Sequence, residues 1–120
     1  MMEENNEIKL SELEEILETE KSEIEASIRR KIKHVTFARA LVWFYYLCKR
    51  DDFVYPREIA KKIKTITTPR AWQILAELEK LGFARRVERG GEKVFVINNN
   101  SNIEKWVREA VETIKKFKEE

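Results

Sequence analysis

The middle of the chain carries two side chains whose types and spacing suit the recognition of base edges. Arg70 and Gln73 lie three residues apart, directly after Thr68 and Pro69. Arginine can donate two hydrogen bonds to guanine, and glutamine can pair with the edge of adenine. These four residues are therefore candidates for contact with DNA. The alternative interpretation is that Arg70 and Gln73 are ordinary solvated residues on a helix surface.

Cations flank this segment on both sides in the sequence. Those before it are Lys61, Lys62 and Lys64, and those after it are Arg86, Arg89 and Lys93. A Lys or Arg that meets a phosphate strengthens binding in a way that depends on salt and not on base sequence. Any one surface lysine is more often simply solvated, so the prediction depends on the grouping. Glu88 and Glu92 offset the later cations, which makes those weaker candidates than Arg70 and Gln73.

Formal charge is segregated along the chain, although its net value is only +2. Residues 1–28 hold ten acids and two bases, whereas residues 29–64 hold eleven bases and three acids. Residues 65–97 carry a net +2, and the remaining segment is balanced. This pattern indicates an anionic partner for the middle of the chain, most often nucleic acid.

The residues do not support an enzyme. His34 is the only histidine and has no Cys, Asp or Glu at a spacing typical of metal sites. Cys48, the only cysteine, is interpreted as a core residue, because nothing near it suggests an activated thiolate. The sequence contains no glycine-rich phosphate loop and no arrangement of nucleophile and base. We therefore predict no catalytic residue, no metal and no cofactor.

The sequence also predicts the cellular compartment. A single cysteine is typical of proteins from a reducing compartment. The N-terminus lacks the basic stretch and apolar run of a secretion signal. The longest apolar run, residues 40–48, is far shorter than the ~20 residues needed to cross a bilayer. These observations predict a cytoplasmic protein without a membrane partner.

Hydrophobic periodicity predicts the elements that position these residues. It predicts helices over residues 12–33, 34–50, 56–64, 69–81 and 103–117, a short edge strand over 53–55, and strands over 83–89 and 92–97. Thr67 or Thr68 is the predicted N-cap of the fourth helix, with Pro69 in its first position. The apolar residues of that helix face inward, so Arg70 and Gln73 are expected to point outward.

The dipeptide Gly90-Gly91 joins the two longer strands and predicts a β-hairpin, because both turn residues can adopt positive φ. A two-residue turn pairs Arg89 with Glu92, Glu88 with Lys93 and Val87 with Val94. Two of these pairs join opposite charges and the third is apolar, so the register is self-consistent. Trp72 is predicted to pack against these strands, with contact at a DNA surface as the alternative.

The order helix, short strand, helix, turn, helix, hairpin resembles that of winged helix-turn-helix domains. Residues 55–60, YPREIA, are similar to the entry of their second helix. Residues 78–83, LEKLGF, followed by Arg85 and Arg86, resemble the exit from their recognition helix into the wing. The similarity covers residues 35–97, and the added terminal helices resemble those of MarR-like and small archaeal-type transcriptional regulators. The implied fold class is mainly α with a small β-hairpin wing, that is, α+β.

The resemblance also implies three parts and a homodimer. Residues 1–33 would be an acidic arm and helix, residues 34–98 the winged helix, and residues 99–120 an amphipathic helix. The first and last parts would form the dimer interface, with contributions from Leu13, Leu17, Ile24, Val107, Ile114 and Phe117. A heptad spacing typical of coiled coils joins Ile103, Val107, Ala110, Ile114 and Phe117 in the last part.

The implied function is sequence-specific binding of double-stranded DNA by a transcriptional regulator. Helix 69–82 would enter the major groove, and hairpin 83–97 would act as the wing. The net charge of residues 65–97 is modest, so a winged-helix module that binds other proteins and not DNA stays an alternative. A winged helix that binds structured RNA is a third alternative.

Overall fold

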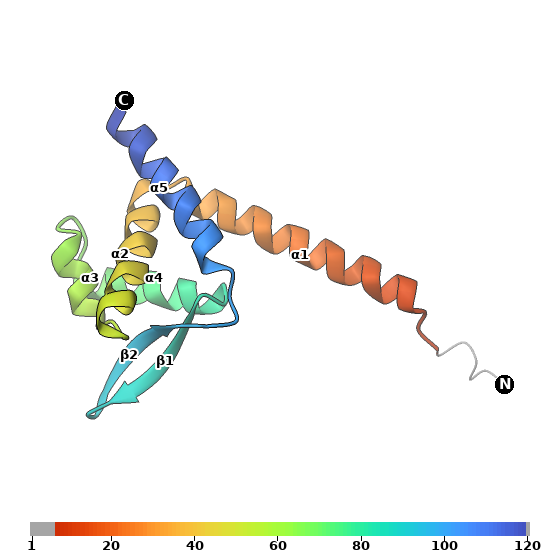
Figure 1. Cartoon of the computed structure of the whole chain (residues 1–120), viewed down its shortest axis with the longest axis horizontal. Coiled ribbons are helices and arrows are strands. Elements are labelled where there is room, and N and C mark those ends of the chain that lie inside the picture. The colour runs from red at the N-terminus through yellow and green to blue at the C-terminus, as the bar shows by residue number, and fades with distance from the viewer. Residues whose placement is uncertain (1–6, 120) are drawn as a thin grey trace.

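The computed structural model describes residues 7–119, which form helices and one two-stranded sheet (Figure 1). The elements in chain order are α1 (Leu10–Ile32), α2 (Val35–Asp51), α3 (Pro56–Lys62), α4 (Thr68–Lys80), β1 (Ala84–Arg89), β2 (Glu92–Ile97) and α5 (Ile103–Glu119). Each predicted helix and each hairpin strand is present, with ends within two residues of those expected. The fold class, mainly α with a hairpin, is confirmed. The part of the predicted acidic arm over residues 1–6 lies outside the described residues.

Local chemistry explains where α4 begins. Thr67 is the N-cap, and its side-chain oxygen accepts a hydrogen bond from the backbone N–H of Arg70 at 3.3 Å. Such a bond satisfies one of the N–H groups that the first helical turn leaves without a partner. Because the helix starts at Thr68, Pro69 is its second residue, one place later than predicted. Arg70 and Gln73 therefore lie in the first two turns of α4.

The hairpin has the predicted register, with Arg89 opposite Glu92 and Val87 opposite Val94. Gly90 and Gly91 both have positive φ, at 56° and 82°, as a two-residue turn of this kind requires. The predicted edge strand over residues 53–55 is reduced to a single bridge. In that bridge Val54 and Phe95 exchange backbone hydrogen bonds, both of 2.9 Å.

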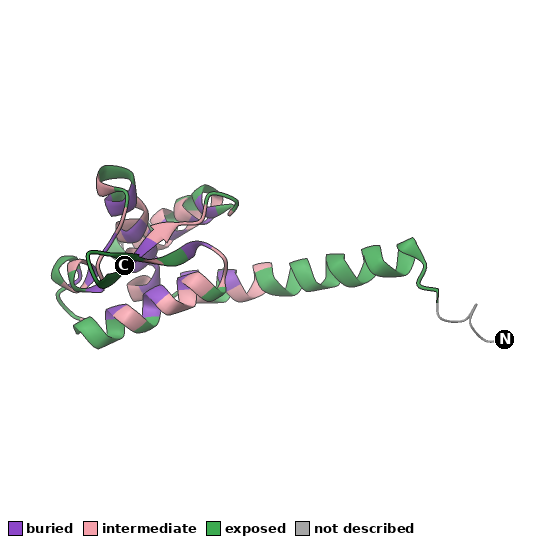
Figure 2. Cartoon of the chain, turned by 90° about the horizontal axis from the view of Figure 1, so that it is seen from below, coloured by how far each residue is buried: buried purple, intermediate pink, exposed green. Residues whose placement is uncertain are grey.

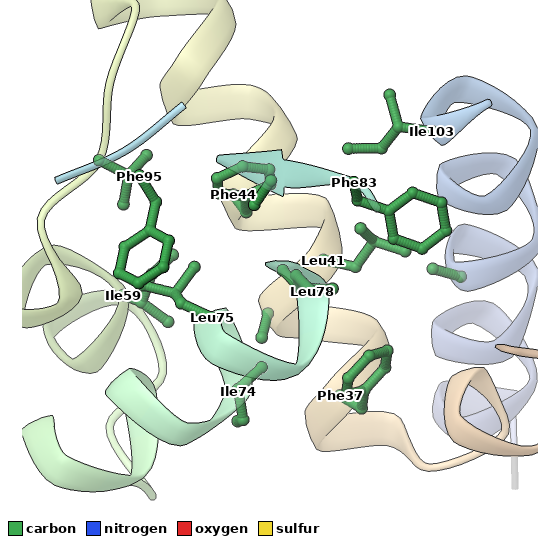
Figure 3. Packing of buried hydrophobic residues seen from close by; sticks show 14 of the residues in the cluster. Phe37, Leu41, Phe44, Ile59, Ile74, Leu75, Leu78, Phe83, Phe95 and Ile103 are labelled. Atoms are coloured by element: carbon green, nitrogen blue, oxygen red, sulfur yellow. The ribbon is translucent and has the colours of Figure 1, made fainter. Parts of the chain in front are cut away.

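The core is built around α2, which was predicted to be largely buried. Leu41 and Phe44 of α2 are fully buried, and they lie among side chains from α4, β2 and α5 (Figure 3). On the α4 side these include Ile74, Leu75 and Leu78, which form one face of that helix. The inward face of α4 is thus fixed by packing, and this leaves its opposite face for solvent.

The two terminal helices differ in how they join this core. α5 packs along α2 and buries Ile103, Trp106 and Ala110. In α1 only Ile28 and Ile32 near the C-terminal end are buried, and residues 10–24 are exposed and project from the body (Figures 1 and 2). Within residues 7–119, no helix combines the length and the hydropathy of a membrane span.

Burial controls the chemistry of the one cysteine. The Cys48 side chain is buried on α2, its Sγ lies 3.8 Å from the carbonyl oxygen of Phe95, and burial raises its pKa from 9.0 to about 12. At pH 8 the thiolate fraction is then roughly 1,000-fold smaller in the folded protein than in the unfolded chain.

We expect iodoacetamide to alkylate Cys48 at pH 8 only in denaturant, with Cys48→Ala as the blank in a mass-spectrometric assay. Rapid labelling of the native protein would contradict this packing.

The same shift has a consequence for stability. The unfolded chain releases the thiol proton above about pH 9, whereas the folded protein holds it until about pH 12. The unfolded state therefore binds fewer protons in this window, and the free energy of unfolding falls as the pH rises through it.

Candidate nucleic-acid interface

The exposed face of α4 brings together the two side chains predicted to read bases. Arg70 and Gln73 are both exposed, on the side opposite the buried Ile74 and Leu75. The Nη1 atom of Arg70 donates a hydrogen bond to Oε1 of Gln73 at 3.1 Å. The prediction that both point outward is confirmed, and the two side chains form a joined pair. Thr68 and Pro69 are exposed at the start of the same helix.

A third residue of α4 links this pair to another helix. Glu77 lies one turn beyond Gln73, and its Oε1 is 4.0 Å from Nη1 of Arg70. Its other oxygen accepts a hydrogen bond from Nζ of Lys31, near the end of α1, at 2.7 Å. The side chains of Lys31 and Glu77 are 38% and 31% exposed, so this ion pair is partly shielded from water.

An open cleft of about 740 Å³ separates the exposed face of α4 from the corner between α1 and α2. Its polar lining includes Arg30, Lys31, His34, Arg70 and Glu77. The first three were not among the individual residues predicted to contact DNA. A run of bases such as Arg29, Arg30 and Lys31 at the end of a helix is already explained by the helix dipole, which it complements. Only the path of α1 across the body shows that this run borders Arg70.

The lysines predicted to meet phosphates lie just before α4. Lys61 and Lys62 end α3, Lys64 follows in the turn, and all three are exposed. The ammonium group of Lys62 is 5.2 Å from the ring centroid of Trp43 on α2. α3 packs against α4, whereas Lys62 and Lys64 line an open cleft with Trp43 of α2 and Ile114 of α5.

The hairpin cations predicted to contact DNA divide into two groups, of which the first contains only Arg86. Its Nη2 donates to Oε1 of Glu79 at 2.9 Å, and its guanidinium lies 5.6 Å from the ring centroid of Trp72. Trp72 in turn meets Phe95 edge to face at 5.4 Å, so its predicted packing against the strands is confirmed. Arg86 therefore connects the hairpin to α4.

The second group lies at the hairpin end and is more exposed. Arg89 lies over the ring of Phe53 at 4.3 Å, and Lys93 is 3.9 Å from Glu88. Glu92 accepts a hydrogen bond from Arg57, at the start of α3, at 3.0 Å. These contacts attach the hairpin end to the body and leave Arg89 and Lys93 on the surface.

Residues 7–119 contain no group of three or more His, Cys, Asp or Glu side chains that could hold a metal ion. In this range α4 and its neighbours bring exposed Arg, Lys and Gln side chains together. They offer hydrogen-bond donors and positive charge, which suit an anionic partner whose base edges carry hydrogen-bond acceptors.

No protein-family model matches the chain, and no curated protein matches it. A solved structure of a MarR family protein from Bacillus stearothermophilus is similar over 97% of this chain and 79% of that one. The sequence identity is 15% and the TM-score is 0.49. The fold itself follows from the order and packing of the elements described above. Residues 35–97 form a winged helix, to which α1 and α5 are added.

Proposed function

We propose that the chain binds double-stranded DNA with sequence preference, as a dimeric transcriptional regulator. In this proposal α4 enters the major groove and the β1–β2 hairpin is the wing. The observation that carries the proposal is the exposed, hydrogen-bonded pair of Arg70 and Gln73 in the first turns of α4. Together these side chains suit a guanine and an adenine edge in the major groove.

The cations around α4 support the proposal. Lys61, Lys62 and Lys64 lie before its first turn, and Arg30 shares the cleft with Arg70. Arg89 and Lys93 are exposed on the hairpin. Each cation that meets a phosphate adds affinity that is independent of base sequence. These charges would hold the protein on the duplex while Arg70 and Gln73 read the bases.

The projecting part of α1 supports the homodimer. Leu13, Leu17 and Ile24 are 38%, 62% and 53% exposed, although they recur at helical intervals. Acids precede residue 26 of this helix and Arg29, Arg30 and Lys31 end it. Two copies of α1 packed antiparallel would bury these apolar side chains and bring acidic and basic ends together. Such a dimer could present two α4 helices about one DNA turn, ~34 Å, apart.

One observation favours a module that binds proteins and not DNA. Arg57 and Arg86 are both engaged in ion pairs with glutamates of the same chain, which lowers the charge available to a phosphate. In that case the exposed face of α4 would contact a partner protein, and duplex DNA would not bind even at low salt.

A salt titration with random duplex DNA tests the proposal. We expect the logarithm of the binding constant to fall linearly with the logarithm of salt concentration, by about 0.9 for each phosphate contact. Lys64→Ala should reduce that slope by about one contact, whereas Lys115→Ala, a change at an exposed cation on α5, should not. Selection from a random-sequence library should then enrich a palindrome. The absence of any binding at low salt would rule out the proposed function.

A further inference from the structure

We infer that Glu77 and Lys31 are specificity-determining positioning residues, which set the arrangement of the Arg70–Gln73 pair. This inference rests on the proposed DNA binding. Four side chains form one chain of contacts from α1 to the exposed face of α4. Lys31 bonds Glu77 at 2.7 Å, Glu77 lies 4.0 Å from Arg70, and Arg70 bonds Gln73 at 3.1 Å.

The spacing on α4 makes this arrangement possible. Residues 70, 73 and 77 follow one another at three and four positions, so their side chains share one face of the helix. Glu77 therefore attracts the guanidinium of Arg70 toward Gln73 along the helix surface. The Arg70 and Glu77 side chains are 49% and 31% exposed, so the solvent screens their attraction less than it would for a fully exposed pair.

The contacts determine which donors remain for a base. Nη1 of Arg70 is directed to Gln73 and Glu77, which leaves the Nε and Nη2 edge of the guanidinium for the two acceptors of guanine. The bond from Arg70 also fixes the Gln73 amide, because its Oε1 is the acceptor. That oxygen keeps a second lone pair, and the Nε2 group keeps its donors, as pairing with adenine requires. The two residues should therefore recognise neighbouring bases as one unit.

Lys31 is needed because Glu77 is negative and would lie close to DNA. Its ammonium group neutralises the carboxylate through the 2.7 Å contact and anchors it at the edge of the cleft. Without Lys31, the full charge of Glu77 would act on Arg70 and compete with guanine for its donors. Removal of either partner should therefore disturb the reading of bases more than the attraction to phosphates.

The test compares binding constants for the enriched palindrome and for random duplex, at one salt concentration. We expect Glu77→Gln and Lys31→Gln each to lower the ratio of the two constants by about tenfold. Affinity for random duplex should change by less than about threefold in Lys31→Gln, because the substitution removes only one cation. The double variant should lose no more than either single variant, because both act through one chain of contacts.

Controls separate positioning from folding. Glu112→Gln removes a carboxylate from an exposed pair on α5 and should leave the ratio unchanged. Glu77→Asp keeps the charge and should retain more of the ratio than Glu77→Gln, and thermal melting checks that each variant is folded. If Glu77→Gln does not fold, Lys31→Gln decides the matter alone.

A wild-type ratio near one would refute the proposed function. A high wild-type ratio that both substitutions leave within about twofold would refute only the positioning role.

Discussion

Replacement of Phe44 by alanine should lower the free energy of unfolding by about 3–5 kcal/mol. Phe44 is fully buried on α2, which contacts every other helix and β2. The substitution removes a large apolar side chain and leaves a cavity that its neighbours can fill only in part. Because small domains are stable by only about 5–15 kcal/mol, much of the folded population should be lost on mild heating. Urea denaturation followed by circular dichroism measures the change.

Tyr46→Ala provides the matched control, because it removes an aromatic side chain from the same helix. Tyr46 is 51% exposed and makes its aromatic contact with Trp43 near the surface. Its loss should lower the free energy of unfolding by no more than about 1 kcal/mol, apart from the effect of the different helix propensity of alanine. Equal denaturation midpoints for the two variants would show that α2 is not the centre of the core.

Simultaneous substitution of Leu13, Leu17 and Ile24 by serine should convert the proposed dimer to a monomer. Each of these side chains contributes about 1.5–3 kcal/mol when it is fully buried, so their joint loss removes several kcal/mol from the proposed interface. The monomer should remain folded, because these residues are exposed in the single chain. Affinity for a palindromic site should fall at least about 100-fold, since only one α4 can then bind at a time.

Sedimentation velocity distinguishes the two species. Thr19→Ala and Ser22→Ala, made together on α1, form the control, because they change two other exposed residues of the same helix that carry no charge. That variant should still sediment as a dimer at moderate salt. A dimer that survives loss of the three apolar side chains must use another surface, and the role proposed for α1 would then fail.

The sequence allowed the local features of the fold to be predicted. The hairpin register depends on two glycines and on neighbouring strand residues, so a short segment contains all the information. The outward direction of Arg70 and Gln73 could be predicted because Ile74, Leu75 and Leu78 define the buried face of α4 by their spacing alone. In both cases the pattern and the structure depend on the same few residues.

Features that depend on packing between distant segments could not be predicted in this way. The ion pair between Lys31 and Glu77 joins residues 46 positions apart, and it exists because the end of α1 passes beside α4. The internal contacts of Arg86 likewise require Glu79 and Trp72 to face β1. Nothing in the residues next to Arg86 distinguishes it from an arginine that faces solvent.

The heptad spacing of the last helix shows a related limit. Val107, Ile114 and Phe117 were predicted to contribute to a dimer interface, whereas Val107 and Ile114 are half-buried and pack against the core of their own chain. A repeat of apolar residues shows that a helix has a partner, and it does not show which helix that partner is. Phe117 is 52% exposed, so the far end of α5 stays available for the proposed dimer.

Because α1 is attached to the body only by its last turns, a small change in its angle moves its free end by a large distance. The 15 exposed residues over 10–24 give a projecting arm of about 22 Å, so a tilt of about 10° where it leaves the body moves the far tip by roughly 4 Å. Conversely, two α1 helices packed along their length in a dimer would fix the angle between each helix and the body of its own chain. The distance between the two halves of a bound palindrome would then depend on the angle at which α1 leaves the body near residue 25, well away from any base pair.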